Sequence, residues 1–86
     1  MSVNLEMERI LAVKAKYEQT LLQKKNVIGL GIGYRERDGE TTDQMVLTVM
    51  VRQKERRSRL RSHDLIPPEL DGVPVDVKEV GMLQAL

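Results

Sequence analysis

The chain has 86 residues, no cysteine and one histidine, which excludes a disulfide framework and makes a metal site or a metal cofactor unexpected. Its formal net charge of +1 and its two tyrosines, the only aromatic residues, argue against nucleic acid, an anionic membrane and base stacking. No segment repeats, and the length predicts one small domain over residues 1–86.

The N-terminal residues are charged and include no apolar run of signal-peptide length. No uninterrupted apolar run elsewhere approaches the length of a membrane span. We therefore expect a cytoplasmic protein with no membrane partner, and export by another route stays open.

The first predicted element is an amphipathic helix over residues 4–25, with Asn4 as its N-cap and Lys24 and Lys25 in its last turn. Apolar residues recur at helical spacing along it, together with the aliphatic stem of Lys14: Val3, Met7, Ile10, Tyr17 and Leu21, widened by Leu11 and Leu22. Such a stripe predicts that the helix packs on the core. Asn26 tolerates the left-handed conformation and is expected to end the helix.

The first strand, about 26–36, alternates glycines with larger residues. With a period of two, Ile28, Leu30, Ile32 and Tyr34 point to one face, and Gly29, Gly31 and Gly33 point to the other. Glycine within a strand costs roughly 0.5–1 kcal/mol. The pattern therefore indicates either a face kept bare for the close approach of another backbone, helix or partner, or a twisted or bulged hairpin strand. A phosphate-binding loop is not favoured, because a charged turn rather than a helix follows the glycines.

A hairpin is predicted next. Residues 35–43 are polar and contain Asp38-Gly39, a pair that supplies positive backbone angles in tight turns. The second strand, about 44–54, places alternate residues on opposite faces: Met45, Leu47, Val49 and Val51 against Val46, Thr48, Met50 and Arg52.

A long Arg-rich and Pro-containing loop, 55–72, follows and has room for one short helical turn. The third strand, about 73–80, places Val73, Val75 and Val77 on one face and Pro74, Asp76 and Lys78 on the other. The predicted fold is α+β in the order α-β-β-β, with the helix packed on a small, mainly antiparallel three-stranded sheet. The order of the strands in the sheet stays open.

No set of residues predicts catalysis. Asp38, Glu40 and Asp43 lack the ligand number of a calcium loop. His63 and Asp64 are neighbours in a loop, where such pairs seldom face each other, and no serine near them is activated. We therefore expect no enzyme activity, no catalytic residue and no cofactor.

One basic cluster stands out in the long loop. It consists of Lys54, Arg56, Arg57, Arg59 and Arg61. Three interpretations are open: a solvated loop, a surface that selects an acidic protein partner, and a phosphate-gripping surface for nucleic acid.

Three segments carry a family resemblance: Asn26 to Gly33, Leu47 to Lys54 and Leu65 to Gly81. Together they resemble the small N-terminal domain that precedes the protease domain in a family of bacterial trypsin-like serine peptidases and related uncharacterised proteins. The Ile-Pro-x-Glu-x-Asp-Gly-Val-Pro-x-Asp-Val segment is the most specific part, and the likeness covers about 26–81. The resemblance implies a non-catalytic accessory or propeptide-like domain, with a trypsin-like protease domain as a possible partner. None of that protease domain's catalytic residues lies in this sequence, which is therefore either a free-standing relative or a piece of a longer product.

The prediction for function is a protein-interaction or self-association module. Its expected docking face consists of Gly29, Gly31, Gly33, Thr48 and Met50, aided by an exposed sheet edge. The loop residues Arg56, Arg57, Arg59 and Arg61 are expected to select the partner by charge. The alternative is a nucleic-acid-binding protein that uses the basic loop 54–61.

Overall fold

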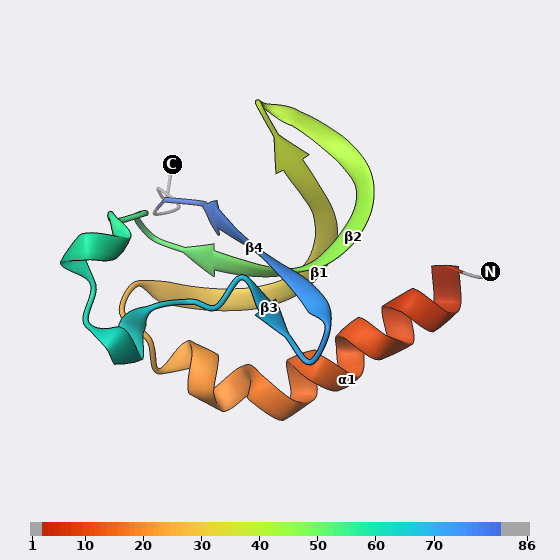
Figure 1. Ribbon diagram of the computed structural model, residues 1–86, viewed down its shortest axis with the longest axis horizontal. Helices are drawn as coiled ribbons and strands as arrows, with labels where there is room; N and C mark the ends of the chain where they lie inside the picture. Colours follow the sequence, from red (N-terminus) through yellow and green to blue (C-terminus); the bar gives the residue numbers. More distant parts are fainter. Residues whose placement is uncertain (1–2, 82–86) are drawn as a thin grey trace, which may run out of the picture.

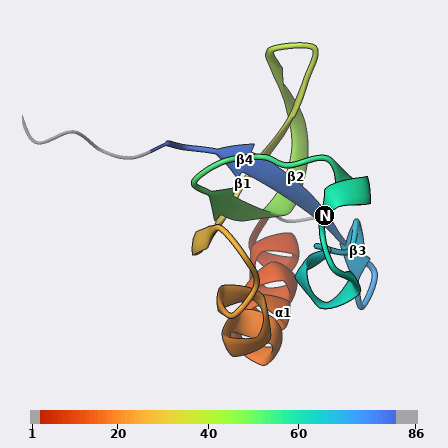
Figure 2. The same ribbon diagram turned by 90° about the vertical axis from the view of Figure 1, so that its left-hand side faces the viewer.

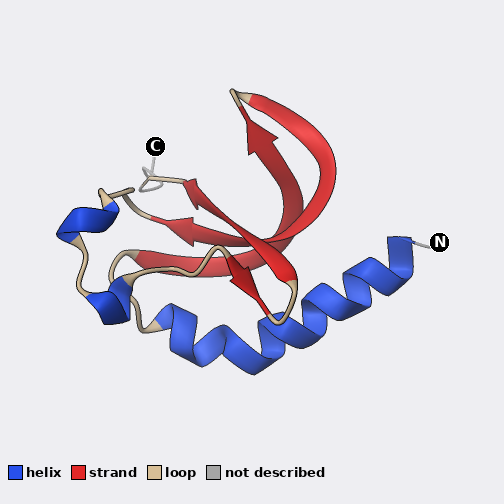
Figure 3. Ribbon diagram, in the orientation of Figure 1, coloured by secondary structure: helices blue, strands red, loops and turns tan. Residues whose placement is uncertain are grey.

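The computed structural model describes residues 3–81, which form one helix and a four-stranded sheet (Figures 1 and 3). The elements are α1 (Val3–Leu22), β1 (Val27–Arg37), β2 (Glu40–Val51), the 3₁₀ turns η1 (Arg57–Arg59) and η2 (Ser62–Asp64), β3 (Glu69–Leu70) and β4 (Val73–Glu79). The helix lies along one face of the sheet (Figure 2). The predicted α+β class and the short helical turn before the last strand are confirmed.

The observed sheet differs from the predicted one in two respects: it has a fourth strand, β3, and β4 runs parallel to β2, so the sheet is mixed. The strand order, which the sequence left open, is β1-β2-β4-β3. The long connection after β2 makes the parallel pairing possible, because it carries the chain back to the end of the sheet where β2 starts. The additional strand β3 pairs with β4 through a tight turn at Asp71 and Gly72, both of which have positive φ angles, 51° and 82°.

The helix is shifted from its predicted bounds. It starts at Val3, so Asn4 lies within it rather than capping it, and it ends at Leu22 rather than at residue 25. Lys24 and Lys25 belong to the turn that leads into β1. Asn26 adopts the expected left-handed conformation, with a φ of 70°.

The core lies between α1 and the sheet face that it covers. Its buried residues are Ile10, Val13 and Leu21 of α1, Val27 of β1, Met45, Leu47, Val49 and Val51 of β2, and Val73 and Val75 of β4. The predicted inner faces of β2 and β4 are therefore confirmed. The helical stripe is narrower than predicted, because Met7, Leu11 and Leu22 are exposed while Val13 is buried.

A bulge at the start of β1 changes the predicted alternation. Val27 pairs with Val51 but Gly29 pairs with Met50, so Ile28 is an extra residue in β1. Val27 lies in the core, and Ile28, which the alternation placed on the same face as Leu30 and Ile32, has a side chain that is 48% exposed. Beyond the bulge the prediction is confirmed for Leu30 and Ile32, which pack against the core.

A second irregularity bends the far half of the hairpin. Between the pairs Tyr34–Met45 and Glu36–Thr41, β2 contains more residues than β1. Thr42 fills this bulge: its Oγ1 donates a hydrogen bond to the Arg35 carbonyl (2.8 Å) and accepts one from the Gln44 N–H (3.2 Å). The hairpin consequently curls away from the helix, toward the outer side of the sheet (Figures 1 and 2). The predicted Asp38-Gly39 turn is confirmed, with φ angles of 54° and 80°.

Candidate docking surface

The predicted docking residues lie together on the outer face of the sheet, opposite α1. The strand register places Gly29 beside Met50, and Met50 beside Lys78 of β4. One step along, Gly31 is beside Thr48, and Thr48 is beside Asp76. The five residues predicted from sequence thus form one continuous patch, and β4 adds two charged side chains to it.

The glycines of this patch make room for side chains of the neighbouring strand. A Cβ atom at Gly33 would lie 2.7 Å from Thr48 Oγ1, and one at Gly29 would lie 3.1 Å from Met50 Cε. Gly31 differs, because a Cβ there would lie 3.8 Å from Met50 Cε, an ordinary contact distance. Side chains of β2 therefore fill the space beside Gly29 and Gly33, and the space above Gly31 is left open.

Over Gly31 the outer face is hollowed into a groove of about 320 Å³, here called the outer-face groove. Its lining residues are Gly31, Ile32, Gly33, Tyr34, Glu36, Thr41, Thr48, Met50, Asp76 and Lys78. The curled hairpin forms one wall. It is tied to β4 by Glu36, whose N–H donates to Asp76 Oδ2 (3.3 Å) and whose carboxylate lies 3.5 Å from Lys78 Nζ.

Sequence reasoning missed the charged wall of the groove. Asp76 and Lys78 had been placed on the outer face of their strand, and the signal needed to add them to the site was the pairing of β4 with β2. Glu36 is the last residue of the predicted first strand and also belongs to the polar stretch 35–43 that contains the turn. The bulge at Thr42 extends the hairpin and brings Glu36 over the sheet.

The arginine-rich loop is exposed but lies apart from the outer-face groove. Arg56, Arg57, Arg59 and Arg61 are all exposed, and none of them lines the groove. Arg57 is held by a hydrogen bond from its guanidinium to the Ile66 carbonyl (3.2 Å). The predicted docking face and the predicted partner-selecting arginines therefore lie on separate parts of the molecule.

The loop is fastened to the turn after the helix. Lys24 Nζ donates to the His63 carbonyl (2.7 Å), the Lys25 N–H donates to Asp64 Oδ1 (2.9 Å), and Asn26 Nδ2 donates to Glu55 Oε2 (2.8 Å). A second cavity of about 280 Å³ lies beside these contacts, with Leu60 and Ile66 among its lining residues. The apolar residues spaced along the loop were the sequence signal for it.

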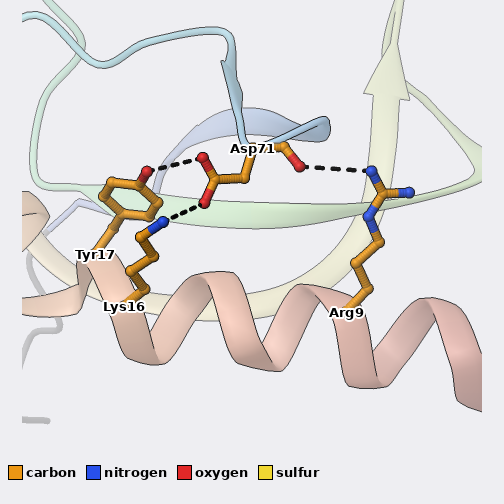
Figure 4. A network of polar contacts seen from close by, with 4 residues as sticks. All are labelled: Arg9, Lys16, Tyr17 and Asp71. Atoms are coloured by element: carbon orange, nitrogen blue, oxygen red, sulfur yellow. Dashed lines mark hydrogen bonds and ion pairs between the residues drawn. The ribbon is translucent and has the colours of Figure 1, made fainter.

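A polar network joins the helix to the β3–β4 turn (Figure 4). Asp71 accepts hydrogen bonds from Lys16 Nζ and from the Tyr17 hydroxyl, both at 2.9 Å, and Arg9 Nη2 approaches the Asp71 carbonyl at 3.5 Å. The Lys16 ammonium also lies 5.2 Å from the centre of the Tyr17 ring. The hydrogen bond from Lys16, aided by that from Tyr17, lowers the pKa of the Asp71 carboxyl, and the same bond to Asp71 raises the pKa of Lys16. These contacts fix the turn on the helix.

His63 and Asp64 do face each other, contrary to expectation. His63 Nε2 lies 3.5 Å from Asp64 Oδ2, and the histidine is exposed. The other oxygen of Asp64 accepts the Lys25 N–H, so this carboxylate also secures the turn after the helix. Over residues 3–81, no three His, Cys, Asp or Glu side chains gather in a group that suits a metal ion.

Comparison with known proteins adds no relative. No family model matches the chain, and a search of curated proteins finds no match. The resemblance to the domain that precedes trypsin-like peptidases therefore stays a prediction. Within the described residues, no helix combines the length and apolar character needed to cross a membrane.

Proposed function

We propose that this protein is a non-catalytic protein-interaction module, and that its outer-face groove receives a segment of a partner protein. One observation carries the proposal: the sheet has a helix on its inner face, and its outer face is hollowed by about 320 Å³ above Gly31. Among residues 3–81, no helix lies on that outer face (Figure 2). A hollow with a partly apolar floor and charged walls suits a protein segment.

The chemistry of the groove favours a peptide backbone over a small charged ligand. Gly31 has no side chain that would keep a partner's backbone away from the floor, and no neighbouring side chain fills the space above it. Glu36, Asp76 and Lys78 present both signs of charge on one wall, and two of them already form an ion pair with each other. An extended segment with alternating side chains matches such a floor and wall.

The same proposal includes the kind of protein that binds in the groove. The resemblance of residues 26–81 suggests a trypsin-like protease domain as the protein that docks here. The exposed arginines 56, 57, 59 and 61 lie away from the groove and suit the selection of an acidic partner surface by long-range attraction.

The test replaces Gly31 by valine. A Cβ at this position meets Met50 Cε only at 3.8 Å, so Gly31→Val is expected to fold while its methyl groups occupy the groove. Proteins captured from cells by the wild-type chain and by the variant are compared by quantitative mass spectrometry. Thr20→Val, which replaces a hydroxyl by a methyl group at an exposed helix position, is the control.

We expect the native partners to be lost with Gly31→Val and kept with Thr20→Val. A folded Gly31→Val chain that retains every partner of the wild type would contradict the proposal. Circular dichroism and thermal unfolding of both variants establish that the comparison is made between folded chains.

The four exposed arginines support one alternative, a nucleic-acid-binding function. Binding through phosphates weakens steeply as salt rises, because counterions are released on binding. The wild-type chain and an Arg59→Glu/Arg61→Glu variant are titrated against single- and double-stranded DNA and RNA at two salt concentrations. Salt-sensitive binding that the double variant loses would favour this alternative, and no binding would remove it.

A further inference from the structure

The two edges of the sheet are built differently. At one edge, β3 has only two residues, Glu69–Leu70, and directly follows Pro67 and Pro68, which cannot donate to a ladder. At the other edge, β1 runs for eleven residues, and its stretch from Val27 to Tyr34 contains no charged residue and no proline. Within residues 3–81, no strand pairs with the outer edge of β1. Long uncharged edge strands of this kind readily add another strand.

The helix carries exposed apolar side chains on the flank beneath this open edge. Met7, Leu11 and Leu22 are 38%, 48% and 42% exposed. At about 100° per residue they fall within an arc of roughly 60° on α1. We call these three residues the edge flank.

The contacts of α1 establish on which side the edge flank lies. Arg9 and Lys16 reach Asp71, so their side of the helix faces the β3–β4 turn. The buried residues Ile10, Val13 and Leu21 face the sheet. The edge flank lies on the other side of this buried stripe from Arg9 and Lys16, and that side faces β1, the strand at the opposite end of the sheet.

A second copy of the chain fits this edge. An antiparallel β1 strand centred on Gly31 would place Gly29 against Gly33 and Leu30 against Ile32, with Ile28 near Tyr34 of the other copy. Glycines thus meet glycines and apolar residues meet apolar residues. The register within β1 is regular from Gly29 to Tyr34, so this pairing uses regular strand except at Ile28, the extra residue of the bulge.

The same twofold axis brings the two helices together. Strands pair about 4.8 Å apart and α1 packs mainly on β1 and β2, which puts the two helix axes at roughly 10 Å, the usual distance for packed helices. The twofold axis passes through Gly31, about 13 Å along β1 from Val27. The same length along α1 is about nine residues, counted back from the turn that joins α1 to β1, so the twofold axis passes near residue 14 of the helix. Met7 of one copy then lies near Leu22 of the other.

The charges of this surface permit such an approach. Lys14 and Glu18 lie near the edge flank and pair with each other at 3.2 Å within one helix. The flank therefore carries no net charge that would repel an identical surface. An apolar patch beside a neutral ion pair and an open strand edge is self-complementary under twofold symmetry.

From these features we propose that two copies of the chain form a symmetric dimer through antiparallel β1 edges and the Met7, Leu11 and Leu22 flanks of α1. The dimer makes one continuous sheet with both helices on its inner face. It leaves both outer-face grooves open on the other face. The inference rests on the proposed function as an interaction module and names one partner, a second copy of the chain.

Solution mass tests the proposal. Light scattering and sedimentation are expected to give twice the mass of one chain for the wild type. Leu11→Glu and Ile28→Lys change exposed side chains and are expected to give the mass of one chain with the circular dichroism spectrum of the folded wild type. Leu5→Glu, an equally drastic change at a 58% exposed position of α1 outside the edge flank, is expected to remain a dimer.

Cross-linking tests the geometry, because the chain has no cysteine of its own. A mixture of Met7→Cys and Leu22→Cys chains is expected to form disulfide-linked dimers under mild oxidation more readily than either variant alone. Replacing Met7→Cys by Leu5→Cys in the mixture is expected to abolish this gain. Equal cross-linking in both mixtures would overturn the antiparallel arrangement.

The outcomes separate this inference from the proposed function. A wild-type chain of single mass at its highest soluble concentration overturns the dimer, and a loss of partners in Gly31→Val would then still support the groove. The control for the groove is Thr41→Arg, because Thr41 lines the groove, is exposed and lies on β2, away from the paired β1 edges. A dimer that survives Leu11→Glu and Ile28→Lys but is lost in Thr41→Arg also overturns the edge pairing, because self-association would then use the groove. A dimer lost in Leu11→Glu but kept in Thr41→Arg supports the inference.

Discussion

The two faces of the sheet are packed differently, although both are formed by the same strands β1, β2 and β4. The inner face presents branched and long apolar side chains, such as Leu47 and Val49, and buries them under α1. The outer face presents Gly31, Thr48 and Asp76 in adjacent strands and is hollowed by a groove. Alternate residues of β2 therefore serve different ends: Leu47 and Val49 on the inner face supply stability, and Thr48 on the outer face supplies shape. Val46 is the exception, because it points to the outer face and is nevertheless fully buried.

The largest effect is expected where the inner face is most completely buried. Leu47 has no exposed surface and packs in the core. Leu47→Ala removes buried methyl groups and leaves a cavity, so we expect the free energy of unfolding to fall by about 3 kcal/mol. Urea denaturation measures this loss. A loss below about 1 kcal/mol would contradict the placement of Leu47 at the centre of the core.

The outer face is expected to be sensitive where a glycine accommodates a neighbour. In Gly33→Ala the new Cβ would lie 2.7 Å from Thr48 Oγ1, and Thr48 is stiff about χ1. We expect a loss of about 1 kcal/mol in the free energy of unfolding, which urea denaturation measures.

A double-mutant cycle identifies the cause of that loss. Thr48→Ala removes the Oγ1 atom, so Gly33→Ala is expected to cost less in the Thr48→Ala background than in the wild type. If the two changes in the free energy of unfolding are strictly additive, the contact between the new Cβ at position 33 and Thr48 Oγ1 is not the cause of the loss.

The tie between the helix and the β3–β4 turn is expected to give a smaller, pH-dependent effect. Asp71 has a lowered pKa in the folded chain, so its contribution to stability is present above its ordinary value of 3.8 and is lost as pH falls through the folded value. Lys16 has a raised pKa, so its contribution is present below its ordinary value of 10.5 and is lost as pH rises through the folded value.

Asp71→Asn separates this charge effect from the turn, because asparagine also accepts the left-handed conformation that Asp71 adopts. We expect the variant to be less stable than the wild type at neutral pH. The difference should shrink as the solution is acidified below the folded pKa of Asp71. Thermal unfolding across the acid range measures it, and a difference that stays constant with pH would refute the ion pair.

The smallest effect, with the opposite sign, is expected at Gly31. A Cβ at Gly31 would make only an ordinary contact with Met50 Cε at 3.8 Å. Gly31→Ala removes the flexibility of glycine from the unfolded chain without strain, so we expect the free energy of unfolding to rise by about 0.5 kcal/mol. The same glycine-to-alanine change thus destabilises at position 33 and stabilises two residues away. Equal effects at both sites would show that the groove over Gly31 is filled.

Local patterns were enough to predict much of the fold. The alternation along β2 and β4 identified which side chains enter the core, because burial on one face imposes that period. The period of α1 identified Ile10 and Leu21 but not Val13. The Asp38-Gly39 pair identified its turn. The second Asp-Gly pair, Asp71-Gly72, also marks a turn, but β3 has only two residues and therefore no alternation that would predict a strand.

Features that depend on distant pairing were not predictable in this way. The parallel pairing of β4 with β2 follows from where the long connection places the chain. Ile28 is exposed because Val27 pairs with Val51 and Gly29 pairs with Met50, which leaves Ile28 as the extra residue of a bulge. For the site, the five residues of the outer face were grouped by alternation alone. The filling of Gly33 by Thr48 required the register between strands.

The parallel pairing of β4 has a kinetic consequence. The hairpin of β1 and β2 joins residues that are close in sequence, and hairpins of this kind form within microseconds. β4 must find β2 across the whole of residues 52–72, and the entropy of closing that loop is lost before its contacts are gained. The helix and hairpin are therefore expected to assemble first. During that interval both edges of the hairpin are unpaired, and the order of events, rather than the final structure, sets how long a newly made chain is exposed to wrong pairings.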